Sequence, residues 1–480
     1  MNKNKKGVLV GVGSVIMITG LVLLINLIVT PPRTVLLTEN GFSPTEITVA
    51  VGETVTFVNR SNKYFWPASD FHPTHEAYPE FDTQQALPPG ATWEFTFTES
   101  GLFKYHDHLA PFYFGIVRVT GVDGELTDSC ISRGGNLACW QDDIFLALAE
   151  DGLGAAYDKV AELYESEPEF AQSCHYIAHN IGLASYGFYR KDSNSIMTPK
   201  ASACASGFHH GFMEAYLGAT DDIASAGGVC EAIGEAVGRD APDARLQCYH
   251  GIGHGVMETF IANTGEFGSV SAVIDAALAQ CEVASEGEEE RFRCASGLFN
   301  GIANLYINNE YGLDVSKENP VTLCAAQEGQ YAESCYGNMN SVIFWMADNQ
   351  FLPAAQAVLS GTKEPHLNVA LEYLAGLYAY NELPSFNSAE VVDVCRRLGT
   401  HQNRCIAGFA HGLLEHGIPE KEYEAALDFC ADATLSVTHK DACYTEVLGD
   451  LDGWYSVEKT RRICNTLTPE LAAYCPQDVI

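Results

Sequence analysis

The sequence predicts a multidomain chain: an N-terminal transmembrane helix, an all-β sandwich, and an all-α array of helical hairpins stapled by disulfides. Three observations lead to this prediction. A long apolar run lies near the N-terminus, short β-branched segments follow it, and all 16 cysteines come after those segments. A length of 480 residues allows about three domains. We expect a cytoplasmic stub and anchor at 1–30, the sandwich at 33–121 and the Cys-rich helical repeats at 127–480.

The apolar run covers residues 7–29 and contains three polar residues. As a helix it would be about 34 Å long, and the hydrocarbon core of a bilayer is about 30 Å thick. Lys3, Lys5 and Lys6 precede it, which predicts a cytoplasmic N-terminus and an extracytoplasmic ectodomain. A cleaved signal peptide is the alternative, but the run does not end in a small-x-small cleavage site. We therefore expect a single-pass protein of the cell membrane.

The composition restricts the partners of the ectodomain. The chain has 27 Lys and Arg against 62 Asp and Glu, which gives a formal net charge of −35. Such a surface repels nucleic acid and anionic lipid and attracts cations. A hydrophobic fraction of 47% supplies a large core and excludes a wholly disordered chain.

Short alternating segments between residues 33 and 121 predict β-strands. They are rich in Val, Ile, Thr and aromatic residues, and Pro or Gly turns separate them. This pattern is typical of a sandwich or a small barrel. The expected strand segments are 46–51, 54–58, 93–97, 103–106 and 115–119.

Two motifs mark the ends of this region. Gly41-Phe42-Ser43-Pro44 precedes an alternating stretch that reaches Phe57, and Pro89-Gly90 precedes a stretch that ends in Gly115-x-Val117-x-Val119. These motifs resemble the opening and the ending of a cupredoxin, the plastocyanin-like fold, over about 90 of the 480 residues. The resemblance implies a β-sandwich. In that family a blue copper ion is bound by two His, one Cys thiolate and a weak axial ligand.

The chain departs from that ligand set. The family's upstream His, Cys, second His and Met positions fall at or near Trp66, Asp107, Ala110 and Tyr113. Because the region contains no Cys, the resemblance implies the fold without a thiolate-bound copper. The segment from His106 to His108 also resembles the His-Cys-His strand of multicopper oxidases, in which the two flanking His bind copper. Only these two His carry over.

Four of the fifteen His of the chain lie in the sandwich region, in the motifs His72-Pro73-Thr74-His75 and His106-Asp107-His108. Side chains alternate along a strand, so His106 and His108 point to one side. Imidazole nitrogen is a good ligand for copper and zinc. The predicted metal site is therefore His72, His75, His106 and His108, with copper expected first and zinc second. Acidic residues near these motifs either supply further oxygen ligands or only contribute a negative electrostatic field. They are Asp70, Glu76, Glu80 and Asp82. The alternative is a degenerate cupredoxin whose His bind nothing.

The remaining residues form an internal repeat of helical character. The frame Cys204-x-x-Gly-x-x-His210-Gly-x-x-Glu214 recurs from Cys248 to Glu258 and from Cys405 to Glu415, and weaker copies lie between them. Steps of about 32–46 residues are typical of stacked helical hairpins, and the array is loosely similar to tetratricopeptide-like solenoids. Glycines inside the predicted helices indicate close helix contacts, because Gly otherwise costs about 1 kcal/mol there.

Each repeat Cys has an upstream companion, which predicts one disulfide across each hairpin loop and an oxidising compartment. Loop closure would stabilise each hairpin by about 2–4 kcal/mol. Reduced core thiols are the alternative. The expected pairs are Cys130–Cys139, Cys174–Cys204, Cys230–Cys248, Cys281–Cys294, Cys324–Cys335, Cys395–Cys405, Cys430–Cys443 and Cys464–Cys475.

His and Glu residues four positions apart in the repeat share one helix face. Two interpretations stay open. The repeated pairs either fix successive helices by hydrogen bonds or line a second metal or catalytic site on the inner surface of the array. The residues of that second candidate cluster are His175, His179, His210, Glu214, His254 and Glu258.

No nucleotide-binding loop, serine-hydrolase elbow, zincin motif or Cys-x-x-Cys is present in the sequence. We expect a membrane-anchored extracytoplasmic metal-binding protein with a His-rich, non-blue copper site. Whether it is an enzyme is left open. One alternative is a non-catalytic surface interaction or scaffold protein, with a protein partner on the helical array. The other is a metal-dependent enzyme that uses the His and Glu of the repeats.

Overall fold

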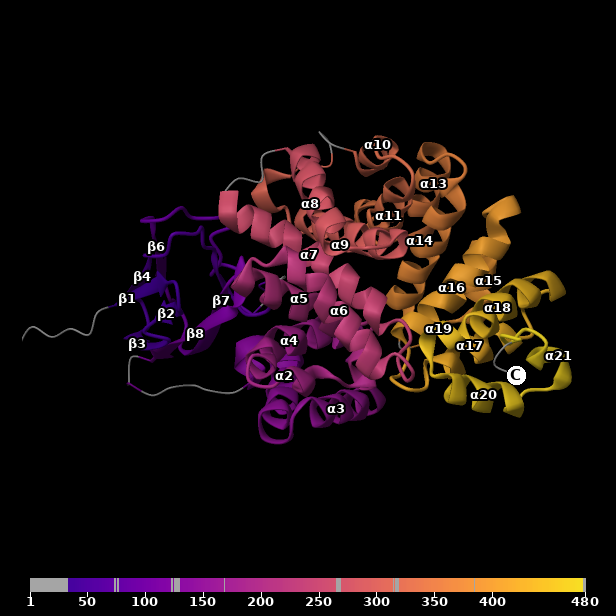
Figure 1. Ribbon diagram of the computed structural model, residues 1–480, viewed down its shortest axis with the longest axis horizontal. Helices are drawn as coiled ribbons and strands as arrows, with labels where there is room; N and C mark the ends of the chain where they lie inside the picture. Colours follow the sequence, from indigo (N-terminus) through magenta and orange to yellow (C-terminus); the bar gives the residue numbers. More distant parts are fainter. Residues whose placement is uncertain are drawn as a thin grey trace, which may run out of the picture.

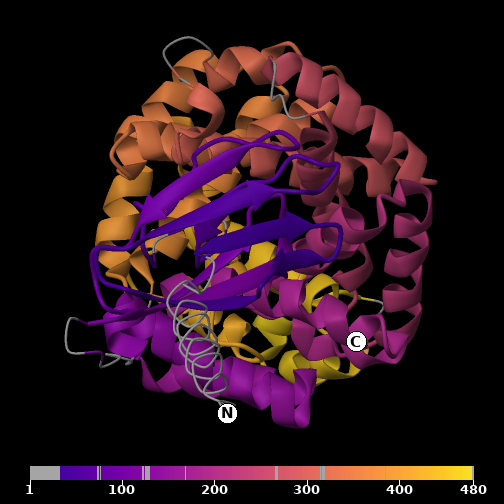
Figure 2. The same cartoon turned by 90° about the vertical axis from the view of Figure 1, so that its left-hand side faces the viewer.

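The computed structural model describes residues 33–477, except 73–74, 76, 122–123, 125–129, 168, 265–268, 314, 316–318 and 384. The expected membrane anchor at 1–30 lies outside the described residues. Among the helices within them, none is long and apolar enough to cross a membrane. The described part is a β-sandwich followed by a ring of helices, with the sandwich against one face of the ring (Figures 1 and 2).

The sandwich confirms the β character expected before residue 121. Its two four-stranded sheets have the strand orders β2-β1-β4-β6 and β3-β8-β7-β5. Strand β1 is parallel to β4 and β3 is parallel to β8, whereas the other pairs are antiparallel. The strands are β1 (Thr34–Thr38), β2 (Gly41–Ser43), β3 (Glu46–Ala50), β4 (Thr54–Asn59), β5 (Pro67–Ser69), β6 (Thr92–Thr96), β7 (Gly101–Asp107) and β8 (Ala110–Thr120).

Alternation along the strands builds the core between the sheets. In β4, Val55 and Phe57 are fully buried, whereas Thr54 and Thr56 beside them are only partly buried. Tyr105 of β7 packs edge-on against Phe57, with ring centroids 5.3 Å apart. Because side chains alternate, burying Tyr105 in this core directs the neighbouring His106 to the opposite side of the sheet.

The helical part contains a layer of helices that pack side by side in chain order. These are α4 (Ala171–Tyr189), α5 (Gly207–Thr220), α7 (Ala244–Thr264), α9 (Glu288–Ile307), α11 (Gln330–Asn338), α14 (His366–Glu382), α16 (Gln402–His416) and α18 (Val437–Gly449). Most of them pack on the helix that precedes them in a hairpin. Those partners are α3 (Leu153–Ser166), α6 (Ile223–Val237), α8 (Val270–Ala284), α10 (Pro320–Ala325), α13 (Phe351–Gly361), α15 (Ser388–Arg396) and α17 (Glu422–Ala431).

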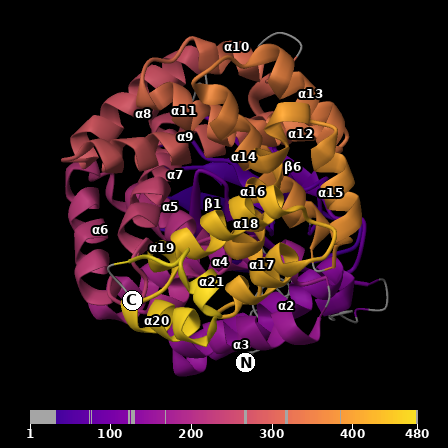
Figure 3. The same cartoon turned by 90° about the vertical axis from the view of Figure 1, so that its right-hand side faces the viewer.

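Shorter or terminal helices complete the array. They are α2 (Cys130–Asp151), α12 (Asn340–Met346), α19 (Leu451–Trp454), α20 (Val457–Thr466) and α21 (Pro469–Ala472). Figure 3 shows the helices following one another around a ring. The array therefore closes on itself, which the sequence did not predict. Tyr164 of α3 donates a hydrogen bond to the carbonyl of His416, and Gln172 Nε2 of α4 donates one to the carbonyl of Leu383, at 3.4 Å.

Seven disulfides confirm seven of the expected neighbour pairs and connect the helices of the hairpins. The side chain of Cys130 lies outside the described side chains, so the eighth pair stays a prediction; Cys139 is disulfide-bonded. The seven are Cys174–Cys204, Cys230–Cys248, Cys281–Cys294, Cys324–Cys335, Cys395–Cys405, Cys430–Cys443 and Cys464–Cys475.

The repeat glycines allow the helices to approach closely, as expected. A Cβ atom at Gly211 of α5 would lie 2.0 Å from the carbonyl oxygen of His179 on α4. One at Gly297 of α9 would lie 1.8 Å from the carbonyl oxygen of His250 on α7. Only a residue without Cβ fits at these crossings. The same close approach brings the His and Glu side chains of neighbouring helices together.

A few residues of the sandwich belong to the apolar core of the ring, whereas the core between the two sheets is a separate cluster. Trp66 and Leu109 of the sandwich belong to the same buried cluster as the helices. The Trp66 ring lies edge-on to Tyr311, with centroids 5.1 Å apart, and Phe71 meets Tyr176 at 5.6 Å. This interface surrounds the His-rich motifs of the sandwich and buries their side chains.

Candidate metal centre

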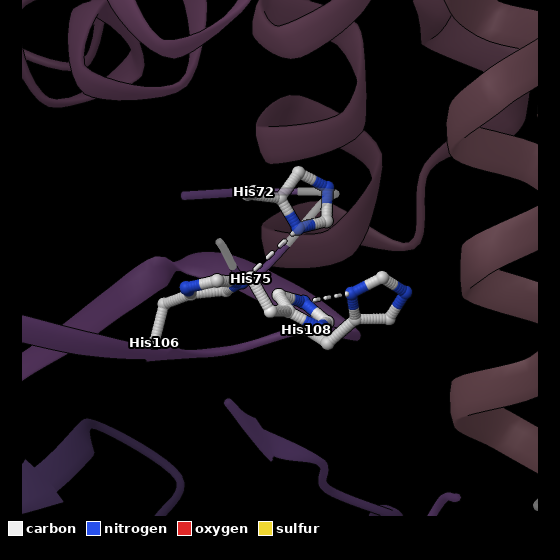
Figure 4. Close-up of side chains that lie close together, drawn as sticks. All are labelled: His72, His75, His106 and His108. Carbon is white, nitrogen blue, oxygen red and sulfur yellow. Dashed lines mark hydrogen bonds between the residues drawn. The ribbon is translucent and has the colours of Figure 1, made fainter. Parts of the chain in front are cut away.

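The four predicted His of the sandwich meet at this interface. His72 and His75 follow β5, which pairs with β7 through Ala68 and His106. His108 lies in the turn between β7 and β8, beside a register shift at His106 and Asp107. Figure 4 shows the four rings gathered from these two segments of chain.

Their nitrogens are close enough to bind one ion. One ligand nitrogen from each ring lies within 4.8 Å of those of the other three. His72 Nδ1 is 3.1 Å from His106 Nε2, and His75 Nε2 is 2.9 Å from His108 Nδ1 (Figure 4). All four residues are at most 4% exposed. The arrangement thus points four imidazole nitrogens at a common, dry position.

The outward nitrogens of two of these rings face carboxylates. His75 Nδ1 lies 2.8 Å from Asp82 Oδ2, and His108 Nε2 lies 3.5 Å from Glu310 Oε2. In metalloproteins, a carboxylate on the far ring nitrogen commonly fixes the tautomer and orientation of a ligand His. The same arrangement here leaves His75 Nε2 and His108 Nδ1 free to face the centre.

Protonation favours ligand chemistry at three of the rings. Burial lowers the pKa of His75, although Asp82 opposes the shift. Burial and the positive charge of neighbouring rings hold the pKa of His106 and of His108 well below the ordinary value. These three imidazoles are therefore neutral at pH 7, as metal binding requires.

His72 differs because it also touches the helical ring. Its Nε2 lies 3.5 Å from Glu214 Oε2 and 3.6 Å from Glu258 Oε1. Burial alone would lower the pKa of His72, but the two carboxylates raise it to about 10. Burial and the neighbouring charge of Glu214 raise the pKa of Glu258 to about 7. A positive charge is thus stabilised at the contact between sandwich and ring.

Asp107, which was expected at the cupredoxin Cys position, accepts hydrogen bonds from the backbone instead of joining this centre. Its Oδ1 accepts hydrogen bonds from the amides of Trp66, at 2.8 Å, and Leu109, at 3.3 Å. Burial raises its pKa to about 7. The Trp66 ring packs on His108, with centroids 4.4 Å apart.

The second candidate cluster of the helical repeats divides into two groups. His179 of α4 and Glu214 of α5 join His72, with His179 Nε2 at 2.9 Å from Glu214 Oε2. Glu214 Oε1 also lies 3.3 Å from His254 Nδ1 on α7, which connects this group to the next. The other group consists of His210, His250 and His254.

Two residues behave differently from the sequence expectation. His175 is not part of either group, because its Nδ1 bonds to the carbonyl of Cys204 at 3.0 Å. His250 belongs to a group but was left out of the expected cluster. Its signal was the spacing of four residues to His254, which places both rings on one helix face. Glu310 had no sequence signal, since it lies in the short 3-10 helix η3 (Glu310–Gly312) outside the repeat frame.

A polar surface pocket opens beside the four-His site. Its lining includes His75, Asp82 and Glu310, and the side chains that complete it are Pro79, Gln84, Asn308 and Asn309. Two carboxylates at this position attract cations, in keeping with the strong negative charge of the chain. The pocket gives an ion or a small molecule a route to the edge of the site.

Comparison with known proteins gives weak likenesses to cupredoxins, confined to about a fifth of the chain. No family profile and no curated protein matches the chain. A purple cupredoxin from Nitrosopumilus maritimus matches 18% of this chain and 98% of its own, at 23% identity and a TM-score of 0.17. A reduced mutant of amicyanin matches 20% of this chain and 87% of its own, at 24% identity and a TM-score of 0.16.

A Cu-containing nitrite reductase from Thermus scotoductus matches 18% of this chain at 30% identity, with a TM-score of 0.16. Only 22% of that enzyme is covered. TM-scores this low assign no function, and the helical ring has no counterpart in these matches. The chemistry of the metal site is therefore inferred from the geometry of its own side chains and not from these matches.

Proposed function

We propose that this protein binds a divalent metal ion, copper first and zinc second, at His72, His75, His106 and His108. The observation that supports the proposal is the convergence of four buried imidazoles on one position, with ligand nitrogens within 4.8 Å of one another. Three of them are neutral and two are oriented by carboxylates, which are the conditions that metal sites require.

Copper is favoured by the donor set. Four imidazole nitrogens without a thiolate suit Cu(II) in a tetragonal geometry, and they also suit Zn(II). Every Cys whose side chain the structure describes is disulfide-bonded. A Cys sulfur is therefore not available, and the strong colour of thiolate-bound copper is not expected. Copper-loaded protein should be pale.

Metal analysis of the purified full-length chain tests this function. The wild-type chain should retain copper after dialysis, and replacing both His106 and His108 by Ala should remove the ion bound at this site. His366→Ala is a suitable control, because this His lies at the start of α14 and stacks on Tyr336. Full copper content in the double variant would refute the proposed site.

The proposed location is outside the cytoplasm, on a membrane anchor formed by residues 1–30. The apolar run with its preceding lysines and the disulfides support it. Protease added to intact cells, or to cells whose outer layer has been opened, should digest the ectodomain. Full protection under both conditions would contradict this placement.

A second candidate function is metal-dependent catalysis, which the surface pocket favours. An ion at the four-His site would lie behind the rings of His75 and His108, which separate it from the pocket residue Glu310, so a small molecule in the pocket would approach it past these rings. A storage, sensing or delivery protein needs no such access for a substrate. Turnover of small polar substrates by the copper-loaded chain, lost in Glu310→Gln with the copper retained, would favour an enzyme.

A further inference from the structure

The two ring nitrogens of His72 face two different sets of ligands. Nδ1 points into the four-His site, 3.1 Å from His106 Nε2. Nε2 points the other way, to Glu214 Oε2 at 3.5 Å and Glu258 Oε1 at 3.6 Å. His72 is thus shared between the sandwich and the helical ring.

The second set could hold an ion of its own. The ligand atoms of His72, His179 and Glu214 lie within 4.8 Å of one another, and all three residues are buried. Glu258 adds a further carboxylate at the same nitrogen of His72. The loop after β5 and the helices α4, α5 and α7 supply these residues, so the set is complete only when both parts are docked.

Charge favours a cation at this position. The ion pairs that Glu214 and Glu258 form with other described residues are all to His. The Oε2 atom of Glu258 is buried and has no hydrogen-bond partner among the described residues. Buried carboxylates in proteins are normally paired or coordinate metals. A mixed set of imidazole and carboxylate suits a divalent transition metal.

We propose that His72, His179, Glu214 and Glu258 bind a second divalent ion, and that the His72 imidazole bridges it to the ion in the four-His site. This inference rests on the proposed function, because the first ion occupies the other nitrogen of the bridge. The bridge forms when both ring nitrogens of His72 release their protons to solvent and each nitrogen gives its lone pair to one ion. The paired centre then joins sandwich and ring.

The architectural alternative requires no second ion. In it, His72 and His179 hold Glu214 only by hydrogen bonds. The two cases differ in metal content and in magnetism. Two Cu(II) ions on one imidazolate couple their electron spins, which quenches their ordinary paramagnetic resonance signal, whereas a single Cu(II) gives an isolated signal.

The experiment is a Cu(II) titration of the full-length chain, followed by elemental analysis and electron paramagnetic resonance. In the wild type, the paramagnetic resonance signal should rise as the first Cu(II) ion binds to the paired centre. It should then fall as the second Cu(II) ion binds. His179→Gln should bind one ion fewer than the wild type and keep the isolated signal at saturation. Glu258→Gln provides an independent variant in case the first fails to fold.

A matched control is His411→Gln, because His411 is also paired with a Glu, at 2.9 Å from Glu446, but on the distant helices α16 and α18. It should retain the wild-type content and the coupled spectrum. Equal copper content in the wild type, His179→Gln and Glu258→Gln, with isolated signals in all, would overturn the second ion while leaving the four-His site intact. If the double variant His106→Ala/His108→Ala retains the full copper content of the wild type, the proposed function itself is refuted.

Discussion

His75 Nδ1 lies 2.8 Å from Asp82 Oδ2, and this contact turns His75 Nε2 toward the other three imidazoles of the metal site. The same carboxylate accepts hydrogen bonds from the Trp66 indole at 2.5 Å and from the Gln84 amide at 2.7 Å. Asp82 is therefore fixed itself, and it orients a predicted ligand without touching the ion.

Replacing Asp82 by Asn should weaken metal binding without abolishing it. Loss of a carboxylate that orients a ligand His typically lowers metal affinity by about 10–100-fold. Competition with a chelator of known affinity measures the change, and the metal content at saturation should stay the same. Glu94→Gln on β6, in the other sheet, is the control. Equal affinities of Asp82→Asn and the wild type would show that Asp82 does not orient a ligand.

Stability in acid should depend on His209, which is 2% exposed. Burial lowers the pKa of His209 to about 4, whereas the unfolded chain titrates near the ordinary value of about 6.5. As the pH falls below about 6.5, His209 binds a proton in the unfolded state but stays neutral in the folded state. The free energy of unfolding therefore decreases. The loss from this residue amounts to about 3 kcal/mol by pH 4.

His209→Gln should therefore lose less stability than the wild type between about pH 6.5 and pH 4. Denaturant unfolding of the metal-free chains at a series of pH values measures the difference. Above pH 7 the two curves should run parallel, because His209 is neutral in both states there. Parallel curves over the whole range would contradict a depressed pKa.

The close approach of helices α14 and α16 depends on Gly408. A Cβ atom there would lie 2.4 Å from the carbonyl oxygen of Glu372. Gly408→Ala should destabilise the fold by about 1–3 kcal/mol, because the helices must move apart. Thermal unfolding measures the effect.

Gly228→Ala is the matched control, since Gly228 is an exposed residue of α6 and a Cβ there meets nothing within 4 Å. It should be neutral or stabilise the helix by up to about 1 kcal/mol. The idea of a required close approach fails if both substitutions have the same effect.

The disulfides predict a simple peptide map. Digestion without reduction should recover Cys281–Cys294 and Cys395–Cys405 as linked peptides, with sequence separations of 13 and 10 residues. Free thiols at these positions in protein from its native compartment would contradict both the staples and the oxidising location.

Local sequence patterns predicted much of the fold and part of the site. The short spacing of His106 and His108 predicted that the two rings meet, although His108 lies in the turn after β7, and short Cys spacings predicted the seven described disulfides. These features depend on a few neighbouring residues. The contact of His72 with Glu214 depends on how the sandwich docks on the ring, which no local pattern encodes.

The helical His show the same limit. A spacing of four put His175 and His179 on one helix face, yet only His179 reaches a carboxylate, because the carbonyl of Cys204 engages His175. The closure of the array was likewise invisible in the repeat, since it depends on contacts such as that of Tyr164 with His416. Both the environment of the two His and the closure of the array depend on packing between residues far apart in the sequence.

The central claim is that one ion lies among His72 Nδ1, His75 Nε2, His106 Nε2 and His108 Nδ1. Anomalous diffraction from a copper-loaded crystal of the chain, recorded on both sides of the copper absorption edge, locates the ion directly. A peak among these four nitrogens is the predicted result. Copper peaks elsewhere with this position empty would contradict it.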